Sequence, residues 1–565
     1  MTTQAAPKQT IQNLINIVGK QHVLTDANDT RLYRQGRRYG AGQVLAVVVP
    51  GTLFEQWQVL QTAVNADCIV IMQAANTGLT GGSTPFGDDY DRPVILMSTR
   101  RLAGIQVIND GQQVICLPGA TLDRLEKDLA PFNREPHSVI GSSCIGASVL
   151  GGVCNNSGGA LVRRGPAYTE LALYARVNES GELELVNHLG VNLGRTPEEI
   201  LTKLENKNYQ IDDIINNSSC CASDQHYSHD VKQVDENTPA RFNADPSRLF
   251  EASGSAGKVC VFAVRLDTFE KIPSQVFYVG TNSHDDLTEI RRFLLKDLPR
   301  LPIAGEYIHR VAYDIGAEYG KDTFMFIEQF GTAKVPAAFA MKDKVDGYLE
   351  KIGLRGLSDK CLQLVTKFLP SHLPKRMNEF RDLYEHHLVI RIENQDVDQV
   401  DGFLKDYFSH QASGNYFKCS DEEGRKAFLH RFAVAGAAIR YRDTHHSEVE
   451  DIVALDIALR RNDREWVETL PKEMDEKIIH KLYYGHFLCH VFHQDYIVKK
   501  GVDPLAMEHE MWHLLDDRGA EYPAEHNVGH LYVAKPALKN HYQKLDPSNS
   551  FNVGIGQTSK LKYWK

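Results

Sequence analysis

The chain has 565 residues, with 63 lysines and arginines against 73 aspartates and glutamates, and a formal net charge of −10. Apolar residues make up 42% and charged residues 24%, a globular composition that excludes collagen, coiled-coil rods and multi-span membrane proteins. The acidic balance also argues against nucleic acid as a partner, because phosphate binding needs clustered positive charge.

Targeting signals and cysteine motifs are not evident. The apolar run at 44–49 is far shorter than the ~20 residues that span a bilayer, and the N-terminus has neither a basic region nor an apolar core of a signal peptide. The ten cysteines are scattered, apart from the adjacent Cys220 and Cys221, and none forms a Cys-x-x-Cys pair. We therefore expect reduced thiols in a cytosolic protein, without a disulfide framework or an iron–sulfur cluster.

The first part of the chain alternates strand and helix patterns. An apolar strand is expected up to Val49, where Pro50 and Gly51 end it, and residues 55–64 have the apolar spacing of a helix. A β-branched strand at 68–72 then leads into a polar loop that is rich in glycine. Residues 44–110 are therefore expected to alternate strand and helix.

The later segments differ in composition and in expected secondary structure. A second Gly/Ser/Asn-rich stretch covers 141–159, residues 206–250 are polar and expected to be irregular, and a strand at 259–266 closes the first domain. From about residue 270 longer helical patterns dominate. The last ~45 residues are again rich in Gly, Pro and Asn, which predicts that the tail returns to a site.

The first glycine-rich loop, residues 73–84, reads QAANTGLTGGST. Because glycine has no side chain, the backbone N–H groups of this loop can approach an anion closely, and the Thr and Ser hydroxyls add further donors. The loop therefore suits a diphosphate. It matches neither the P-loop pattern GxxxxGK[ST] nor the GxGxxG of nicotinamide-binding domains. A tight turn with solvated polar residues is the alternative for this loop taken alone.

The second loop, residues 140–159, reads IGSSCIGASVLGGVCNNSGG and holds six glycines. The two loops, the strand that ends in Val49-Pro50 and the later GSAGKVCVFAVRL together resemble the FAD-linked oxidases of the vanillyl-alcohol-oxidase type. Within that family the chain is similar to the membrane-associated, quinone-linked D-lactate dehydrogenases of bacteria. Segments such as REPHSVIGSSCIGAS, KAFLHRFAVAGAAIRY, LYYGHFLCHVFHQDYIVKKGVD and YPAEHNVGHLY carry this resemblance over nearly the whole chain.

The resemblance implies an α+β fold. It consists of a two-part FAD-binding domain of the vanillyl-alcohol-oxidase type, an α+β cap domain and a helical membrane-contact segment. The expected divisions are 1–268 for the FAD-binding domain, 269–330 and 381–514 for the cap, 331–380 for the basic membrane-contact segment, and 515–565 for the C-terminal return to the FAD-binding domain.

The same resemblance assigns the flavin pocket. The residues expected to hold FAD are Ala74, Ala75, Asn76, Thr77 and Gly78, with Gly82 and Ser83 beside the pyrophosphate and Gly141, Ser148, Gly158 and Val261 completing the pocket. Some family members attach the flavin through a histidine of the first loop. Because no histidine lies between Gln73 and Pro85, we expect dissociable, non-covalent FAD.

Oxidation of a 2-hydroxy acid needs a cation for the carboxylate and a base for the hydroxyl proton. The resemblance assigns the first role to Arg431, since a guanidinium can make a bidentate contact; a surface salt bridge is the alternative. It assigns the second role to His526, which follows Glu525. Asn527 stands where the family has glycine, but asparagine tolerates positive φ, so we expect the turn to persist.

His486 and His493 match two family histidines that, with Glu525, bind a divalent metal. The Gly-Asp-Gly-Asn turn of relatives is replaced here by Leu-Cys-His-Val. On a straight helix the two rings would lie about 10.5 Å apart, and on a straight strand they would lie on opposite faces, so only a turn would bring both to one metal. The alternative is that the histidines line the substrate pocket as hydrogen-bond donors.

Residues 331–376 carry nine basic and four acidic residues, a local charge of +5 in a chain of −10. Leu362, Val365, Phe368 and Leu369 follow helical spacing within this segment. A basic amphipathic helix can lie on an anionic lipid surface, and a helix with a solvated basic face is the alternative. With the resemblance, the segment predicts a peripheral protein on the cytoplasmic face of the bacterial inner membrane.

The functional prediction is oxidation of D-lactate to pyruvate, with hydride transfer to FAD, proton transfer to His526 and electron transfer to membrane quinone. A flavin dehydrogenase for another 2-hydroxy acid is the nearest alternative. A His/Glu metal-dependent hydrolase and a non-catalytic nucleotide-binding module are alternatives from other classes.

Overall fold

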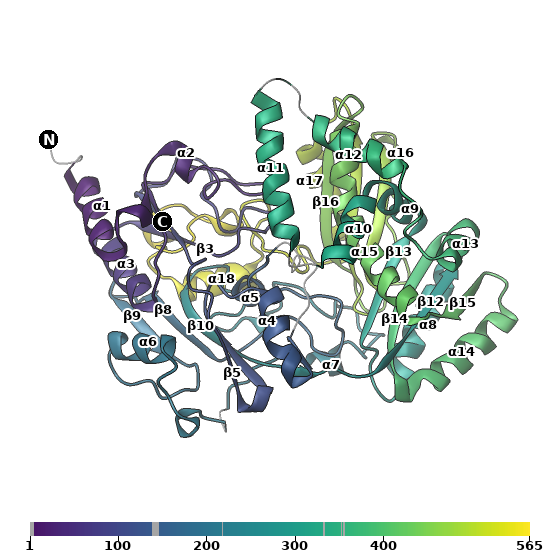
Figure 1. Ribbon diagram of the computed structural model, residues 1–565, viewed down its shortest axis with the longest axis horizontal. Coiled ribbons are helices and arrows are strands. Elements are labelled where there is room, and N and C mark those ends of the chain that lie inside the picture. Colours follow the sequence, from purple (N-terminus) through teal and green to yellow (C-terminus); the bar gives the residue numbers. More distant parts are fainter. Residues whose placement is uncertain (1–4, 138–145, 217–218, 332–333, 352, 354–355) are drawn as a thin grey trace.

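A computed structural model describes residues 5–137, 146–216, 219–331, 334–351, 353 and 356–565 (Figure 1). The N-terminal part contains a four-stranded sheet in the order β1-β2-β4-β3, in which β2, β3 and β4 run parallel. Helix α3 begins after Thr52, whose hydroxyl accepts from the Glu55 N–H as an N-cap. The elements of this part are α1 (Ala5–Val18), β1 (Val23–Leu24), α2 (Ala27–Thr30), β2 (Ala46–Val48), α3 (Leu53–Asn65), β3 (Ile69–Gln73) and β4 (Val94–Ser98).

A second, antiparallel sheet lies beside the first, with the strand order β5-β6-β10-β8-β9. Its central strand β10 is buried along seven of its eight residues, as a strand covered on both faces should be. Its strands and the helices between them are β5 (Ile105–Ile108), β6 (Gln113–Cys116), α4 (Leu122–Leu129), α5 (Val149–Cys154), β8 (Ala172–Val177), β9 (Leu183–Asn187), α6 (Pro197–Glu205), α7 (Tyr227–Asp230) and β10 (Cys260–Asp267). A short ribbon pairs β7 (Arg134–Glu135) with β11 (Phe269–Glu270).

The other half of the molecule is built on a seven-stranded antiparallel sheet in the order β15-β12-β14-β13-β17-β18-β16. One apolar core packs α9 and α15 on one face, and a second core packs α8, α14 and α17 on the other. The elements are β12 (Ser274–Thr281), α8 (His284–Arg292), β13 (Ala304–His309), α9 (Arg310–Tyr319), β14 (His386–Glu393), α14 (Val397–His410), β15 (Gly414–Lys418), α15 (Asp421–Thr444), β16 (Val449–Ala458), α16 (Lys472–Asp475), β17 (Ile478–His486), β18 (Val491–Lys499) and α17 (Pro504–Arg518).

Four further helices lie between α9 and β14 in the chain: α10 (Lys321–Phe330), α11 (Val335–Lys351), α12 (Leu357–Lys367) and α13 (Lys375–Leu383). Helix α12 buries polar side chains and exposes apolar ones. Its buried residues are Asp359, Gln363 and Thr366, whereas Val365 is 57% exposed and Phe368, just after the helix, is 83% exposed. No helix in the described ranges is long and apolar enough to cross a bilayer.

The C-terminal tail returns to the N-terminal sheet after α18 (Pro536–Leu545), and its yellow trace runs among the purple segments in Figure 1. The Val70 N–H donates to the Ser550 carbonyl at 2.9 Å, and the Asn552 N–H donates to the Val70 carbonyl at 3.0 Å. The Asn552 side chain also donates to the carbonyl of Gly82 at 3.1 Å. The tail therefore fixes β3 and the loop that follows it. The mixed helix-and-sheet architecture expected from the sequence is confirmed.

Candidate active site

A cavity of about 1010 Å³ lies between the two halves of the molecule. Its walls come from the first glycine-rich loop, the α5 region, the Ala256–Val261 segment, strands β13, β17 and β18, helix α15 and the turn at 525–527. The predicted site residues that line it are Ala74, Ala75, Asn76, Thr77, Gly78, Gly82, Ser83, Ser148, Gly158, Val261, Arg431, His486, His493, Glu525 and His526. Gly141 lies outside the described residues.

The first glycine-rich loop is held open toward the cavity by its own hydrogen bonds. The Gln73 amide at the end of β3 donates to the carbonyls of Tyr33 and Ser83 at 2.7 and 2.8 Å. Asn76 adopts a left-handed conformation (φ +53°), and its side-chain oxygen accepts from the Ser83 hydroxyl at 3.1 Å. A Cβ added to Gly78 would meet no atom within 4 Å. This open, backbone-lined concavity fits a nucleotide cofactor such as FAD.

Gly82 and Gly158 line the cavity as expected and also lie against other side chains of the protein. A Cβ at Gly82 would lie 2.2 Å from the Asn527 side chain, and one at Gly158 would lie 2.2 Å from the guanidinium carbon of Arg241. Both glycines are therefore required by contacts within the protein, in addition to lining the cavity. Ser148 caps α5, since its hydroxyl accepts from the Gly151 N–H at 3.0 Å.

His486 and His493 are brought together by a hairpin. Residues 487–490 form the turn between β17 and β18, and His490 takes the left-handed conformation there (φ +58°). In the ladder His493 pairs with Tyr484, two residues before His486, so the two histidines share a face of the sheet. Their ring centres are 5.6 Å apart. The turn that the metal prediction required therefore forms without its glycines.

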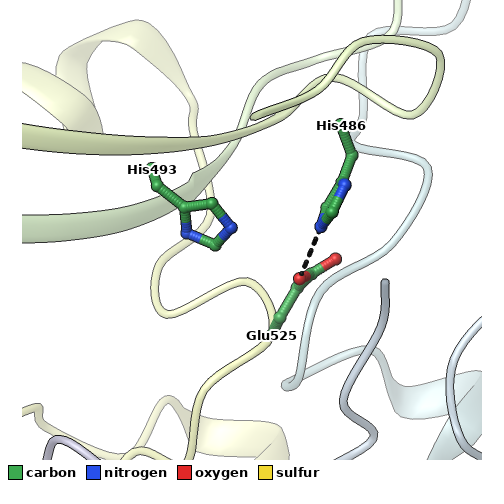
Figure 2. A group of neighbouring side chains, drawn as sticks. All are labelled: His486, His493 and Glu525. Carbon is green, nitrogen blue, oxygen red and sulfur yellow. Dashed lines mark ion pairs between the residues drawn. The ribbon is translucent and has the colours of Figure 1, made fainter. Parts of the chain in front are cut away.

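Glu525 completes this group from the C-terminal tail (Figure 2). Its carboxylate lies 3.2 Å from His486 Nε2, and one ligand atom from each of the three residues lies within 4.8 Å of the others. Two imidazoles and a carboxylate form a donor set that suits zinc, iron or manganese. The residues present therefore fit a divalent metal.

Two buried carboxylates behind the histidines were missed by sequence reasoning. Glu306 on β13 lies 2.7 Å from His486 Nδ1, and Asp456 on β16 lies 3.6 Å from His493 Nδ1. A carboxylate at Nδ1 orients an imidazole so that Nε2 faces a metal or substrate. No local motif marks either residue, because each reaches the site through sheet pairing.

Burial and charge keep these groups in defined protonation states. Burial lowers the pKa of His486, although Glu306 opposes the shift. Burial and the nearby Arg431 lower the pKa of His493 well below the usual value. Both histidines are therefore neutral at pH 7 and able to bind a metal. Burial alone would raise the pKa of Glu306, but its interactions with His486 and Arg431, including the hydrogen bond from His486, outweigh burial and hold that pKa below its usual value.

Arg431 lies on α15 and is 7% exposed, so it is not a surface salt-bridge residue. Its Nε lies 2.8 Å from a carboxylate oxygen of Glu306, and its guanidinium packs over the ring of Tyr484 at 4.7 Å. Within the described residues no hydrogen bond engages its two Nη atoms. These atoms are the donors that remain for an anion in the cavity.

His526 stacks on His493 with 5.6 Å between ring centres, and its Nδ1 lies 3.6 Å from Asp456 Oδ2. The same oxygen accepts the N–H groups of Glu525 and His526 at 2.7 and 2.8 Å. Asp456 therefore fixes the backbone that carries both residues.

The turn after His526 differs in detail from the expectation. Its left-handed residue is Gly529 (φ +57°), and Asn527 does not have a positive φ. Asn527 instead accepts the Gly529 N–H at 2.6 Å through its side chain, and its carbonyl accepts from the Thr80 hydroxyl at 2.7 Å. The backbone of Asn527 thus joins the turn to the first glycine-rich loop, and its side chain stabilises the turn itself.

Arg241 is a further residue that the sequence did not indicate. It is 1% exposed, forms an ion pair with Glu525 and donates to the Gly159 carbonyl at 3.3 Å. It therefore connects the second glycine-rich loop to the candidate metal ligand Glu525.

Comparisons with known proteins agree with this geometry. A family model described as "D-lactate dehydrogenase, membrane binding" matches residues 276–564, and one described as "FAD binding domain" matches residues 44–184. The chain is 59% identical to a quinone-dependent D-lactate dehydrogenase of Haemophilus influenzae, covering 99% of both chains. It is 57% identical to the Escherichia coli enzyme of the same name, covering 99% of this chain and 98% of that one.

Among solved structures, p-cresol methylhydroxylase with bound substrate aligns with a TM-score of 0.59 at 11% identity, covering 98% of this chain and 97% of that chain. The 4-ethylphenol oxidase of Gulosibacter chungangensis aligns with a TM-score of 0.55 at 12% identity, covering 98% and 97%. These likenesses show the fold alone, and they confirm the expected vanillyl-alcohol-oxidase-type architecture with its FAD-binding domain. The chain belongs to the family of quinone-dependent D-lactate dehydrogenases.

Proposed function

We propose that this member of the family oxidises D-lactate to pyruvate and reduces a membrane quinone to quinol. Two electrons and two protons leave the substrate and are taken up by the quinone, so the overall reaction balances. The observation that carries the proposal is the convergence of Arg431, His526 and the His486–His493–Glu525 group on one cavity, opposite a glycine-rich cradle.

Arg431 is the residue proposed to bind the substrate carboxylate. Its Nε faces Glu306, which leaves the two Nη atoms for a bidentate contact with a carboxylate. Because Glu306 and the Tyr484 ring hold the guanidinium on two sides, little side-chain entropy is lost when lactate binds.

His526 is the residue proposed to take the hydroxyl proton. Asp456 lies behind its Nδ1, which leaves Nε2 for the substrate and favours the imidazolium formed when the proton arrives. Arg431 and His526 thereby hold the two ends of a small 2-hydroxy acid.

FAD bound in the cradle would accept the hydride from C2 of the substrate. We propose that it binds without a covalent link, because no histidine lies between Gln73 and Pro85. Denatured, filtered enzyme should release all its flavin, and a flavin–peptide adduct in the mass spectrum would contradict this.

We also propose a divalent metal at His486, His493 and Glu525. A cation held there would polarise the substrate hydroxyl. The support is the donor set itself and the two carboxylates, Glu306 and Asp456, placed behind the imidazoles.

The basic segment is proposed to hold the enzyme on an anionic lipid surface at the cytoplasmic face of the membrane. Its net charge of +5 favours anionic headgroups, and the exposed side chains of Leu364, Val365 and Phe368 on and after α12 supply apolar contact with the acyl layer. The reversed polarity of α12, with buried Asp359 and Gln363, supports this over a helix that faces water.

Anaerobic titration tests the function directly. D-lactate should bleach the flavin absorption of the purified enzyme, and L-lactate at the same concentration should not. Equal bleaching by another 2-hydroxy acid would assign a different substrate, and no bleaching by D-lactate would refute the proposal.

A further inference from the structure

The cavity extends beyond the residues proposed to bind lactate and FAD. Past Arg431 it continues along α15 to Arg440 and Asp443, and it is also lined there by Val335 and Lys342 of α11 and by Asp359 of α12. Nine residues separate Arg431 from Arg440, so this arm is about 14 Å long. One end lies at the reaction site, and the other lies at α11 and α12 of the predicted membrane-contact segment. In Figure 1, α11 stands between the N-terminal half and the half that carries α12.

The wall of this arm is an unpartnered face of α15. Phe432, Gly436 and Ile439 follow one another at spacings of four and three, so they share one face of the helix. Gly436 and Ala435 are exposed, and Ile439 is 47% exposed. A Cβ placed on Gly436 would meet no atom within 4 Å. This helix face is therefore flat, apolar and open to the cavity.

One residue that lines the arm, Arg440, has a buried donor without an acceptor. Arg440 is 9% exposed, its Nε lies 2.7 Å from Asp359 of α12, and its Nη2 donates to Asp322 at 2.9 Å. Its Nη1 is buried and has no hydrogen-bond partner among the described residues. An unpaired buried donor is destabilising, and an acceptor bound in the arm would offset that cost.

We propose that this arm is the quinone-binding site. The quinone ring lies on the open face of α15 at Ala435 and Gly436, and one of its carbonyls accepts from Arg440 Nη1. Its isoprenoid tail runs past Ile439 and Val335 toward the lipid. This inference rests on the proposed function and adds to it the position of the acceptor. The site fits a quinone because it combines a flat apolar wall, one donor and an outlet at the membrane-contact helices.

A larger side chain on the open face of α15 should slow quinone reduction and leave flavin reduction by D-lactate nearly unchanged. Gly436→Leu adds a side chain where the cavity is open, so kcat/KM for a quinone with one isoprene unit should fall about tenfold or more. The anaerobic rate of flavin reduction by D-lactate should stay within about twofold, because the lactate contacts lie one to two turns away. The matched control is Gly402→Leu on α14, an exposed helical glycine with equally open surroundings, and it should change neither rate.

Unchanged quinone turnover in Gly436→Leu, or an equal loss of flavin reduction, would overturn the site. If the parent enzyme's flavin is not reduced by D-lactate at all, the proposed function fails instead. A labelling experiment without turnover still decides the site in that case.

That second experiment photolyses the holoenzyme with a short-chain azido-quinone and digests it with trypsin. Cleavage after Arg431 and Arg440 releases the peptide 432–440, which should carry the label and lose it when excess unlabelled quinone is present. Label confined to α11 and α12, or label displaced equally by quinone-free phospholipid, would show an occupant other than quinone and refute the proposal.

Discussion

Replacing Asp456 by asparagine removes one negative charge from behind His526 and His493 and keeps the shape of the side chain. Asparagine has the same shape, and its carbonyl oxygen can still accept the N–H groups of Glu525 and His526 that Asp456 Oδ2 accepts now. The variant therefore tests the electrostatic contribution of the carboxylate while the backbone hydrogen bonds of the turn are kept.

The size of that contribution follows from the geometry. Two unit charges 3.6 Å apart interact by about 4.6 kcal/mol at an effective dielectric constant of 20. The His526 side chain is 39% exposed, so solvent screening reduces the contribution to about 2 kcal/mol. Loss of about 2 kcal/mol from a transition state in which His526 becomes charged slows flavin reduction by D-lactate about 30-fold.

Anaerobic stopped-flow absorbance at saturating D-lactate measures this rate. Asp286→Asn is the matched control, since Asp286 is also buried and hydrogen-bonded, to Tyr407 and Ser413, but does not line the cavity. A folded Asp456→Asn variant with less than about threefold loss, or an equal loss in Asp286→Asn, would refute the role of the charge.

Four further outcomes are expected. Arg431→Lys loses the bidentate donor and should lower kcat/KM for D-lactate about 100-fold, a cost of about 3 kcal/mol, measured by steady-state dye reduction. Glu306→Gln should lower the free energy of unfolding by about 3 kcal/mol. Because the pKa of Glu306 is lowered in the fold, the difference in unfolding free energy between parent and variant, measured in urea, should be largest above about pH 5 and shrink as the pH falls below about 4.3. His493→Ala should remove the metal found by elemental analysis of the parent, and a parent without metal that resists EDTA would contradict the metal site. Phe368→Glu should lower binding to anionic vesicles about tenfold or more, whereas Ile211→Glu, at another exposed apolar position outside the basic segment, should leave it unchanged.

The local parts of the site were readable in the sequence. A strand followed by a glycine-rich loop indicates an anion cradle because the signal is carried by adjacent residues, and the observed loop after β3 has that form. The resemblance added the roles of His486, His493 and the pair Glu525–His526. It also added Arg431, which no spacing would single out on a helix of mixed polarity.

The remaining parts depend on contacts between distant segments. Glu306 reaches His486 across 180 positions, and Arg241 reaches Glu525 across 284, so neither leaves a local pattern. The turn at 487–490 forms because the ladder of β17 and β18 closes it, even where the sequence lacks the glycines that usually predict such a turn.

The sequence by itself determined the elements, the two glycine-rich loops and the basic segment, because these follow from the conformational preferences and charges of neighbouring residues. The tertiary structure alone decided which face of α12 is buried and which carboxylates stand behind the histidines. It also decided that the open face of α15 lines the same cavity as Arg431 and residues of α11 and α12. Those features depend on packing between segments far apart in the chain, and packing is a property of the folded whole.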